Sequence, residues 1–188
     1  MKNVVSILML FFLFGNAMAQ DDMNSGVVYG ENYAFLLVAP NGWVLDNSSG
    51  ESQGLHAVFY KKGESWEKAE TVMYAAGNPI KNKKYKTFDD FVSSDVNQFK
   101  NDYKDLILIA APSILISDST KAIVKYFSGN TYANFDAIAY IDAGKTAVVI
   151  AMSSRTKEGF EQSKEAFQKL VESYVFITAK FNIKKISK

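Results

Sequence analysis

The residue types that carry acid-base or metal chemistry are sparse in this sequence. It contains one histidine, His56, and no cysteine, which excludes thiol nucleophiles, disulfides and cysteine-bound metals. Because a site built from imidazoles needs two or three histidines, His56 could act only as one ligand among carboxylates. We interpret it as either a structural residue or a residue at the rim of the sheet. We therefore predict no catalytic residue, no metal site and no cofactor.

Two pairs of adjacent carboxylates, Asp21-Asp22 and Asp89-Asp90, could suggest a cation site. Neither pair has the Asp-x-Asp-x-Asp-Gly spacing of a calcium loop. We interpret the first pair as part of a polar leader and the second as the start of a helix. One enzymatic alternative stays open, an atypical hydrolase that gathers carboxylates, tyrosines and His56 in one deep pocket.

Aromatic side chains are the stronger candidates for recognition. Trp43 directly follows the turn Pro40-Asn41-Gly42, where a tryptophan is usually a core residue at the end of a sheet. Trp66 lies between two glutamates in a predicted hairpin loop. Exposed aromatic residues with polar neighbours often anchor protein partners. We predict Trp66, Trp43 and Tyr60 as binding residues, with Trp66 as the best candidate.

The first residues have the pattern of a secretory signal peptide. Lys2 precedes an apolar run from Val4 to Phe14, and Ala17-Met18-Ala19 supplies the small residues of a cleavage site. The run is too short for a helix that spans a bilayer, which needs about 20 residues. We predict cleavage after Ala19 and an exported protein, periplasmic or secreted, without stable membrane insertion. A buried N-terminal helix and an uncleaved anchor are the alternatives.

The charges are nearly balanced, with 21 basic residues (Lys and Arg) against 20 acidic ones (Asp and Glu). Proteins that bind nucleic acid usually carry a basic excess, so we predict no nucleic-acid partner. One local cluster consists of Lys81, Lys83, Lys84 and Lys86. We interpret it as a solvated loop before a helix, with an acidic docking surface as the alternative.

Periodicity in the apolar residues predicts two helices among many strands. Helical spacing begins after Thr87, which together with Asp90 resembles a capping box with Asp in place of the usual Glu, and it begins again after Thr156. Pro112 lies within one of the apolar runs, which predicts a strand that is either at a sheet edge or interrupted at this residue. The predicted strands cover residues 33–39, 55–60, 70–76, 106–116, 121–128, 135–141 and 146–153.

This order of elements predicts an α+β fold, because hairpin-joined strands with helices at two points form an antiparallel sheet covered by helices. We predict a central, mostly antiparallel β-sheet of about six to seven strands sandwiched by α-helices. The expected organisation is a signal peptide over 1–19, a flexible leader over 20–30, a single domain over 31–178 and a basic tail over 179–188.

With these elements in place, the chain resembles the PsbP/Mog1-like family, which includes bacterial DcrB lipoproteins. The matching features are the turn from Pro40 to Trp43, the helix introduced by residues 87–91, the three-strand meander and the closing helix that runs into residues 170–176. The resemblance implies an α-β-α sandwich used as a binding or assembly module, and it implies no catalytic residues. Lacking the lipid-bearing cysteine, this chain would be free rather than tethered.

We therefore predict an exported, non-catalytic binding or assembly-accessory protein. Its expected partner is another envelope protein or a small apolar ligand.

The export prediction is tested by the mass of the protein recovered from the cell envelope. We expect a mass that corresponds to a chain beginning at Gln20, because signal peptidase cleaves after the small-x-small triplet. A mass equal to that of the full precursor would contradict the prediction.

Overall fold

The computed structural model describes residues 24–116, 120–129 and 131–180. The predicted signal peptide and most of the predicted basic tail lie outside these residues. In the part that the structure describes, no helix is long and apolar enough to cross a bilayer.

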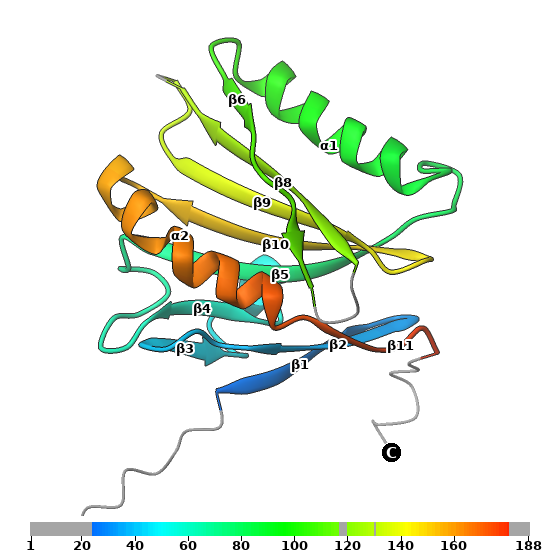
Figure 1. Cartoon of the computed structure of the whole chain (residues 1–188), viewed down its shortest axis with the longest axis horizontal. Helices are drawn as coiled ribbons and strands as arrows, with labels where there is room; N and C mark the ends of the chain where they lie inside the picture. The colour runs from blue at the N-terminus through cyan, green and yellow to red at the C-terminus, as the bar shows by residue number, and fades with distance from the viewer. Residues whose placement is uncertain (1–23, 117–119, 130, 181–188) are drawn as a thin grey trace, which may run out of the picture.

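An antiparallel sheet forms the centre of the molecule (Figure 1). Its strands are β3 (Trp43–Asp46), β4 (Val58–Lys61), β5 (Thr71–Pro79), β6 (Ile107–Ala110), β7 (Ile114–Leu115), β8 (Lys121–Ser128), β9 (Phe135–Asp142) and β10 (Thr146–Ser154). They are ordered β3-β4-β5-β10-β9-β8-β6, with β7 paired to β8. The predicted fold class is confirmed, and β10 lies at the centre of the sheet.

The two predicted helices begin directly after the predicted capping residues, Thr87 and Thr156. Before α1 (Phe88–Asp102), the Asp90 amide donates to Thr87 Oγ1 at 3.0 Å, and the Thr87 amide donates to Asp90 Oδ2 at 3.0 Å. Before α2 (Lys157–Glu172), the Gly159 amide donates to Thr156 Oγ1 at 3.0 Å. Each cap satisfies a backbone donor that has no partner inside the helix, so it fixes the start of the helix.

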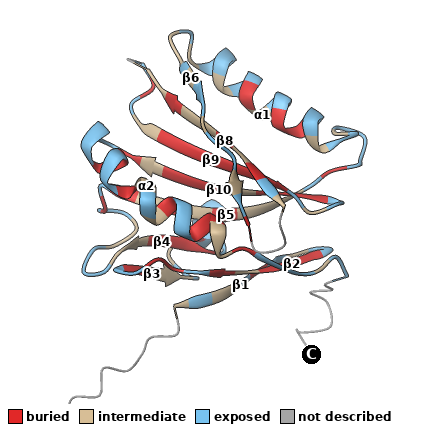
Figure 2. Ribbon diagram, viewed as in Figure 1, coloured by how far each residue is buried: buried red, intermediate tan, exposed pale blue. Residues whose placement is uncertain are grey.

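Both faces of the sheet are covered. On one face, α2 packs Phe160, Phe167 and Leu170 against the central strands. On the other face, α1 packs Phe91, Val92 and Val96 against residues that include Ile138 and Tyr140. The central strands β9 and β10 are therefore buried along almost their whole length (Figure 2).

A second sheet of three strands, β1 (Ser25–Gly30), β2 (Tyr33–Val38) and β11 (Val175–Thr178), packs beside α2. The prediction that residues 20–30 form a flexible leader is wrong for 25–30, because β1 pairs with β2 along its full length. The strand at 33–39 was expected in the central sheet, and it lies in this second sheet instead. The reason is the closing segment β11, which pairs with β2 and completes a separate layer.

The two sheets meet at Tyr33. Its ring lies on Gly77, where an added Cβ would come within 2.5 to 2.8 Å of three ring carbons. Phe35 stacks on Tyr33 at 5.9 Å between ring centroids and meets Tyr174 at 5.4 Å. The missing side chain at Gly77 thus lets β5 approach β2 closely.

One edge of the main sheet differs from the sequence prediction, and the other edge agrees with it. Trp43 begins β3, an edge strand that the sequence analysis did not predict. The predicted interruption at Pro112 is confirmed, since it separates β6 from β7, and both of these strands pair with β8.

Substitution of a core phenylalanine tests the packing of α2. Phe167 is 2% exposed, so Phe167→Ala should lower the free energy of unfolding by about 3 to 5 kcal/mol. Phe176→Ala is the matched control, because Phe176 is 41% exposed and its truncation leaves no enclosed cavity. Denaturant unfolding of both variants measures the two losses, and equal losses would show that α2 is packed differently.

Candidate functional site

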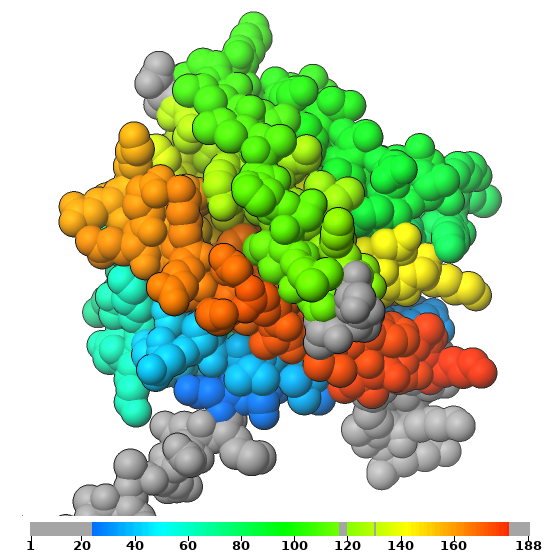
Figure 3. All heavy atoms as spheres, in the orientation of Figure 1, coloured from blue at the N-terminus to red at the C-terminus, as the bar shows by residue number. Residues whose placement is uncertain are grey.

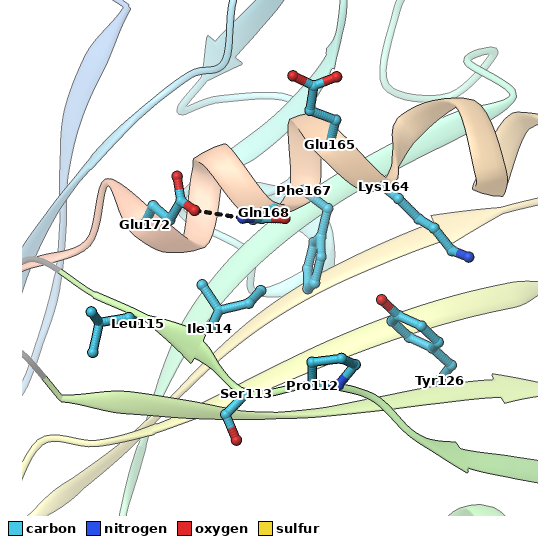
Figure 4. A pocket seen from close by; sticks show the side chains of 10 residues that line it. All are labelled: Pro112, Ser113, Ile114, Leu115, Tyr126, Lys164, Glu165, Phe167, Gln168 and Glu172. Atoms are coloured by element: carbon cyan, nitrogen blue, oxygen red, sulfur yellow. Dashed lines mark hydrogen bonds between the residues drawn. The ribbon is translucent and has the colours of Figure 1, made fainter.

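A groove runs between α2 and the strand pair β7–β8, with a volume of about 480 Å³ (Figure 4). Its floor is apolar and contains Phe167 from α2, Tyr126 from β8 and Ile114 from β7. The remaining lining residues are Pro112, Ser113, Leu115, Lys164, Glu165, Gln168 and Glu172.

The break in the edge strand positions one wall of the groove. The Ala111 amide still donates to the Val124 carbonyl at 3.2 Å, and pairing with β8 resumes at Ile114, opposite Ala122. Between these points Pro112 has no amide proton to give to the ladder. The chain therefore bends away from β8 for a few residues beside α2.

The rim of the groove is polar and held in place by local interactions. The Lys164 ammonium lies 5.3 Å from the ring centroids of Tyr126 and Phe160, and it pairs with Glu161 at 2.7 Å. Hydrogen bonds from Lys169 and Gln168 hold the pKa of Glu172 below its usual range. An apolar floor with a fixed polar rim suits a side chain or short segment that has both apolar and polar groups.

Large apolar residues continue from the groove along the open edge of the sheet. Ile107 and Ile109 on β6 are 55% and 54% exposed, and Leu115 on β7 is 58% exposed. Ile109 pairs with Tyr126, so the two side chains lie on the same face of the sheet. The groove and the strip of isoleucines therefore form one surface on the side of α2.

The predicted binding residues do not form one surface. Trp43 is 4% exposed and belongs to the main core, so its prediction as a contact residue is wrong. It fills the space between the sheets because the turn at Pro40 and Gly42 directs it inward, and the Trp43 amide donates to the Pro40 carbonyl at 3.0 Å.

Trp66 and Tyr60 lie away from the groove. Trp66 is half-buried in the β4–β5 connection, with its ring edge-on to Tyr74 at 6.4 Å. The Tyr60 hydroxyl donates to Asp46 Oδ2 at 2.8 Å. Tyr60 pairs with Val72 and thus shares a face with Tyr74, the face that also carries α1.

Carboxylates and tyrosines do cluster, but inside the core. The Tyr140 hydroxyl donates to Asp95 Oδ2 at 2.6 Å, and the Tyr132 hydroxyl donates to Asp136 Oδ2. Burial raises the pKa of both carboxyls and raises the pKa of neighbouring Tyr74 to about 12. These groups tie α1 and the loop before β9 to the sheet, and Asp136 is buried, with 8% of its surface exposed.

His56 takes no part in this cluster, since it is exposed in the loop before β4. Among the described residues no three His, Asp or Glu side chains are arranged to hold a metal ion. The atypical hydrolase alternative required His56 together with the carboxylates in one deep pocket, and the structure does not bring them together.

One motif escaped the sequence analysis. Residues 50–54 read Gly-Glu-Ser-Gln-Gly, which has the Gly-x-Ser-x-Gly spacing of a hydrolase nucleophile turn, and His56 follows closely. In hydrolases this turn connects a strand to a helix and strains the serine backbone. Here residues 51–53 form a short 3-10 turn in a loop between two strands, and the Ser52 φ angle is not positive. No hydrogen bond joins Ser52 to His56, so the motif does not form that site.

Comparison with known proteins supports the fold alone. No family model and no curated protein matches the sequence. Among solved structures, cyanobacterial PsbP (CyanoP) from Synechocystis sp. PCC 6803 matches with a TM-score of 0.51 and 14% identity, over 87% of this chain and 99% of that one.

Two structures of Mog1 match over 83% of this chain and 97% of theirs. One is a point variant of Mog1 at 16% identity and a TM-score of 0.46, and the other is the Saccharomyces cerevisiae Ran-binding protein Mog1p at 12% and 0.48. The predicted resemblance is confirmed at the level of the fold, which is PsbP-like.

The buried carboxyl of Asp136 predicts a pH dependence of stability. Because burial raises its pKa in the folded state, this group favours folding below about pH 4, and that contribution is lost as the pH rises through the folded pKa. The variant Asp136→Asn has no carboxyl to ionise at this position. The free energy of unfolding of the variant should therefore fall less between about pH 4 and about pH 8 than that of the wild type.

Denaturant unfolding at a series of pH values provides the measurement. Asp102→Asn is the control, because Asp102 is exposed at the end of α1, and it should keep the pH dependence of the wild type. An unchanged pH dependence in Asp136→Asn would contradict the assignment of a buried carboxyl with a raised pKa.

Proposed function

We propose that this protein is an exported, non-catalytic binding or assembly-accessory protein that takes up an extended apolar segment of another envelope protein. The observation that carries the proposal is the open β6–β7 edge, where three large apolar side chains are more than half exposed beside the groove. Export rests on the signal-peptide pattern of the sequence.

The edge offers backbone groups to such a segment. Ala111 bonds to Val124 across the ladder, and in an antiparallel pair the bonded residues alternate along the strand. The amides and carbonyls of Leu108 and Ala110 therefore point away from β8. An added strand could pair with these groups, while its side chains contact Ile107 and Ile109, as in recognition by strand addition.

The groove supplies the specificity that backbone pairing lacks. A volume of about 480 Å³ is within the range of sites that hold a ligand. A bulky apolar side chain of the partner would lie on Phe167 and Tyr126, with its polar backbone near Gln168. A small apolar ligand in the same groove is the second candidate, supported by the same floor.

We propose no catalytic role because the side chains that could act as nucleophile, base or acid lie in different places. His56 and Ser52 are exposed in one loop, whereas the Asp95 and Asp136 carboxyls are held by tyrosines under α1. The binding-module role implied by the family resemblance points in the same direction.

Affinity capture after cross-linking in the native envelope tests the proposed edge. Ile109→Asp should reduce capture of the partner at least about ten-fold, because burial of an isoleucine contributes about 1.5 to 3 kcal/mol and a carboxylate there would be desolvated. Val27→Asp is the matched control, since Val27 is 41% exposed on β1 and lies away from the groove.

Trp66→Ala is run beside these variants, because Trp66 and Tyr60 remain a proposed second contact region. Loss of capture in Trp66→Ala alone would move the site to the opposite face of the sheet. Equal capture by the wild type and Ile109→Asp would contradict strand addition at β6. Thermal melting of each variant shows whether the fold is intact.

A further inference from the structure

Three segments that are distant in the sequence meet at one end of the molecule. They are the loop of residues 80–86, the β9–β10 turn and the end of β11. The Ile80 amide donates to the Lys145 carbonyl at 2.9 Å, which joins the first two. Phe176 lines a small cavity of about 150 Å³ with Ile141 and Ala143, which joins the third. Figure 3 shows these green, yellow and red segments together at the right-hand end.

Exposed lysines gather at this end. Lys81, Lys83, Lys84 and Lys86 lie on the loop, and Lys145 lies on the turn. Lys180 follows β11, and the sequence beyond it adds three more lysines and no acidic residue. We call the surface formed by these six described lysines, together with Tyr29, Phe176 and Ile177, the basic end.

The lysine loop has a defined backbone. The Asn82 side-chain amide donates to the Pro79 carbonyl at 2.8 Å, and its oxygen accepts from the Lys84 and Tyr85 amides at 2.8 and 2.9 Å. The Tyr85 ring lies edge-on to Phe91 at 5.1 Å, which fixes the loop to α1. The backbone that carries these lysines is therefore held in one position, while their long side chains can adapt to a surface.

The charge of these lysines is poorly compensated. Within the described residues, no ion pair joins Lys81, Lys83, Lys86 or Lys145 to a carboxylate. Four carboxylates lie near this end, those of Glu31, Asp89, Asp90 and Asp142. Two of them are engaged by backbone amides, Asp90 by the residues before α1 and Asp142 by Gly144.

Apolar side chains lie among these charges. Tyr29 is 43% exposed, Phe176 is 41% exposed and Ile177 is 49% exposed. The cavity of about 150 Å³ beside Phe176 is smaller than most sites that hold a ligand, and the hollow of about 700 Å³ beside Lys84 is lined by polar residues of α1 and, among the described residues, by no second lysine. An extended anionic surface with an apolar layer beneath it fits this arrangement better than a compact ligand.

We propose that the basic end docks on a bilayer that contains anionic phospholipids. The lysines attract the headgroups, while Tyr29, Phe176 and Ile177 enter the boundary between headgroups and acyl chains. Each lysine near such a surface increases the membrane partition coefficient about five-fold. Because salt screens the attraction, a lysine more than about 10 Å from the membrane surface contributes little. The association is thus peripheral, reversible and sensitive to salt.

Vesicle flotation of the protein purified from the envelope tests this proposal. Vesicles of phosphatidylcholine alone are compared with vesicles that also contain phosphatidylglycerol. We expect binding to the anionic vesicles only, decreasing with added salt. The double variant Lys81→Gln/Lys83→Gln should reduce the partition coefficient about 10- to 30-fold.

The control is Lys68→Gln/Lys157→Gln, which removes the same charge from exposed lysines at the opposite end of β5 and β10. It should keep binding within about two-fold of the wild type, because its lysines lie about 30 Å from the surface, beyond the screening length. Equal binding to the two kinds of vesicle, or equal losses in the two double variants, would overturn the proposal. All exchanged lysines are exposed, and melting temperatures confirm that the variants are folded.

Discussion

Burial of the central strands on both faces is the constraint on which the rest of the structure depends. In β10, Val148, Ile150 and Met152 face α2, while Ala147 and Ala151 face α1. A strand that is apolar on both sides needs cover on both sides. The capped helix α1 provides it on one face, and α2 together with the three-stranded sheet provides it on the other. The small sheet is therefore part of the same packing, and Gly77 under Tyr33 is the contact that lets it approach.

The same arrangement leaves one edge of the main sheet open. The β3 edge is short, whereas the other edge continues through β6 and β7 with Ile107, Ile109 and Leu115 exposed. Edge strands usually carry charges, bulges or cover that prevent pairing with other chains. Pro112 interrupts this edge but leaves its apolar residues uncovered within the described part of the chain. An uncovered apolar edge beside a groove lowers solubility and favours aggregation unless a partner occupies it, so the fold itself favours the proposed function.

The sequence predicts what is encoded locally and fails where distant segments meet. Thr87, Asp90 and Thr156 identify the helix starts because capping involves residues only three apart. β1 was missed because Val28 is its one fully buried residue, so its stability comes from pairing with β2. The groove could not be predicted either, since it needs Phe167 and Ile114 side by side. Trp43 is buried, as a tryptophan after such a turn usually is. Its burial shows that an aromatic residue type does not by itself distinguish a core residue from a residue that contacts a partner.

The two proposed surfaces are compatible in space, and strand directions show why. β9 ends at Asp142, beside the basic end, and β8 runs antiparallel to it, so β8 begins near the basic end and finishes far from it. β6 pairs with the distant half of β8, with Ile107 opposite Ser128. β7, at Ile114, pairs with the near half. When the basic end rests on a bilayer, the open edge thus rises away from the surface, with the groove nearer to the membrane than Ile107. A partner segment that emerges from the membrane would reach the groove first and could then extend along β6.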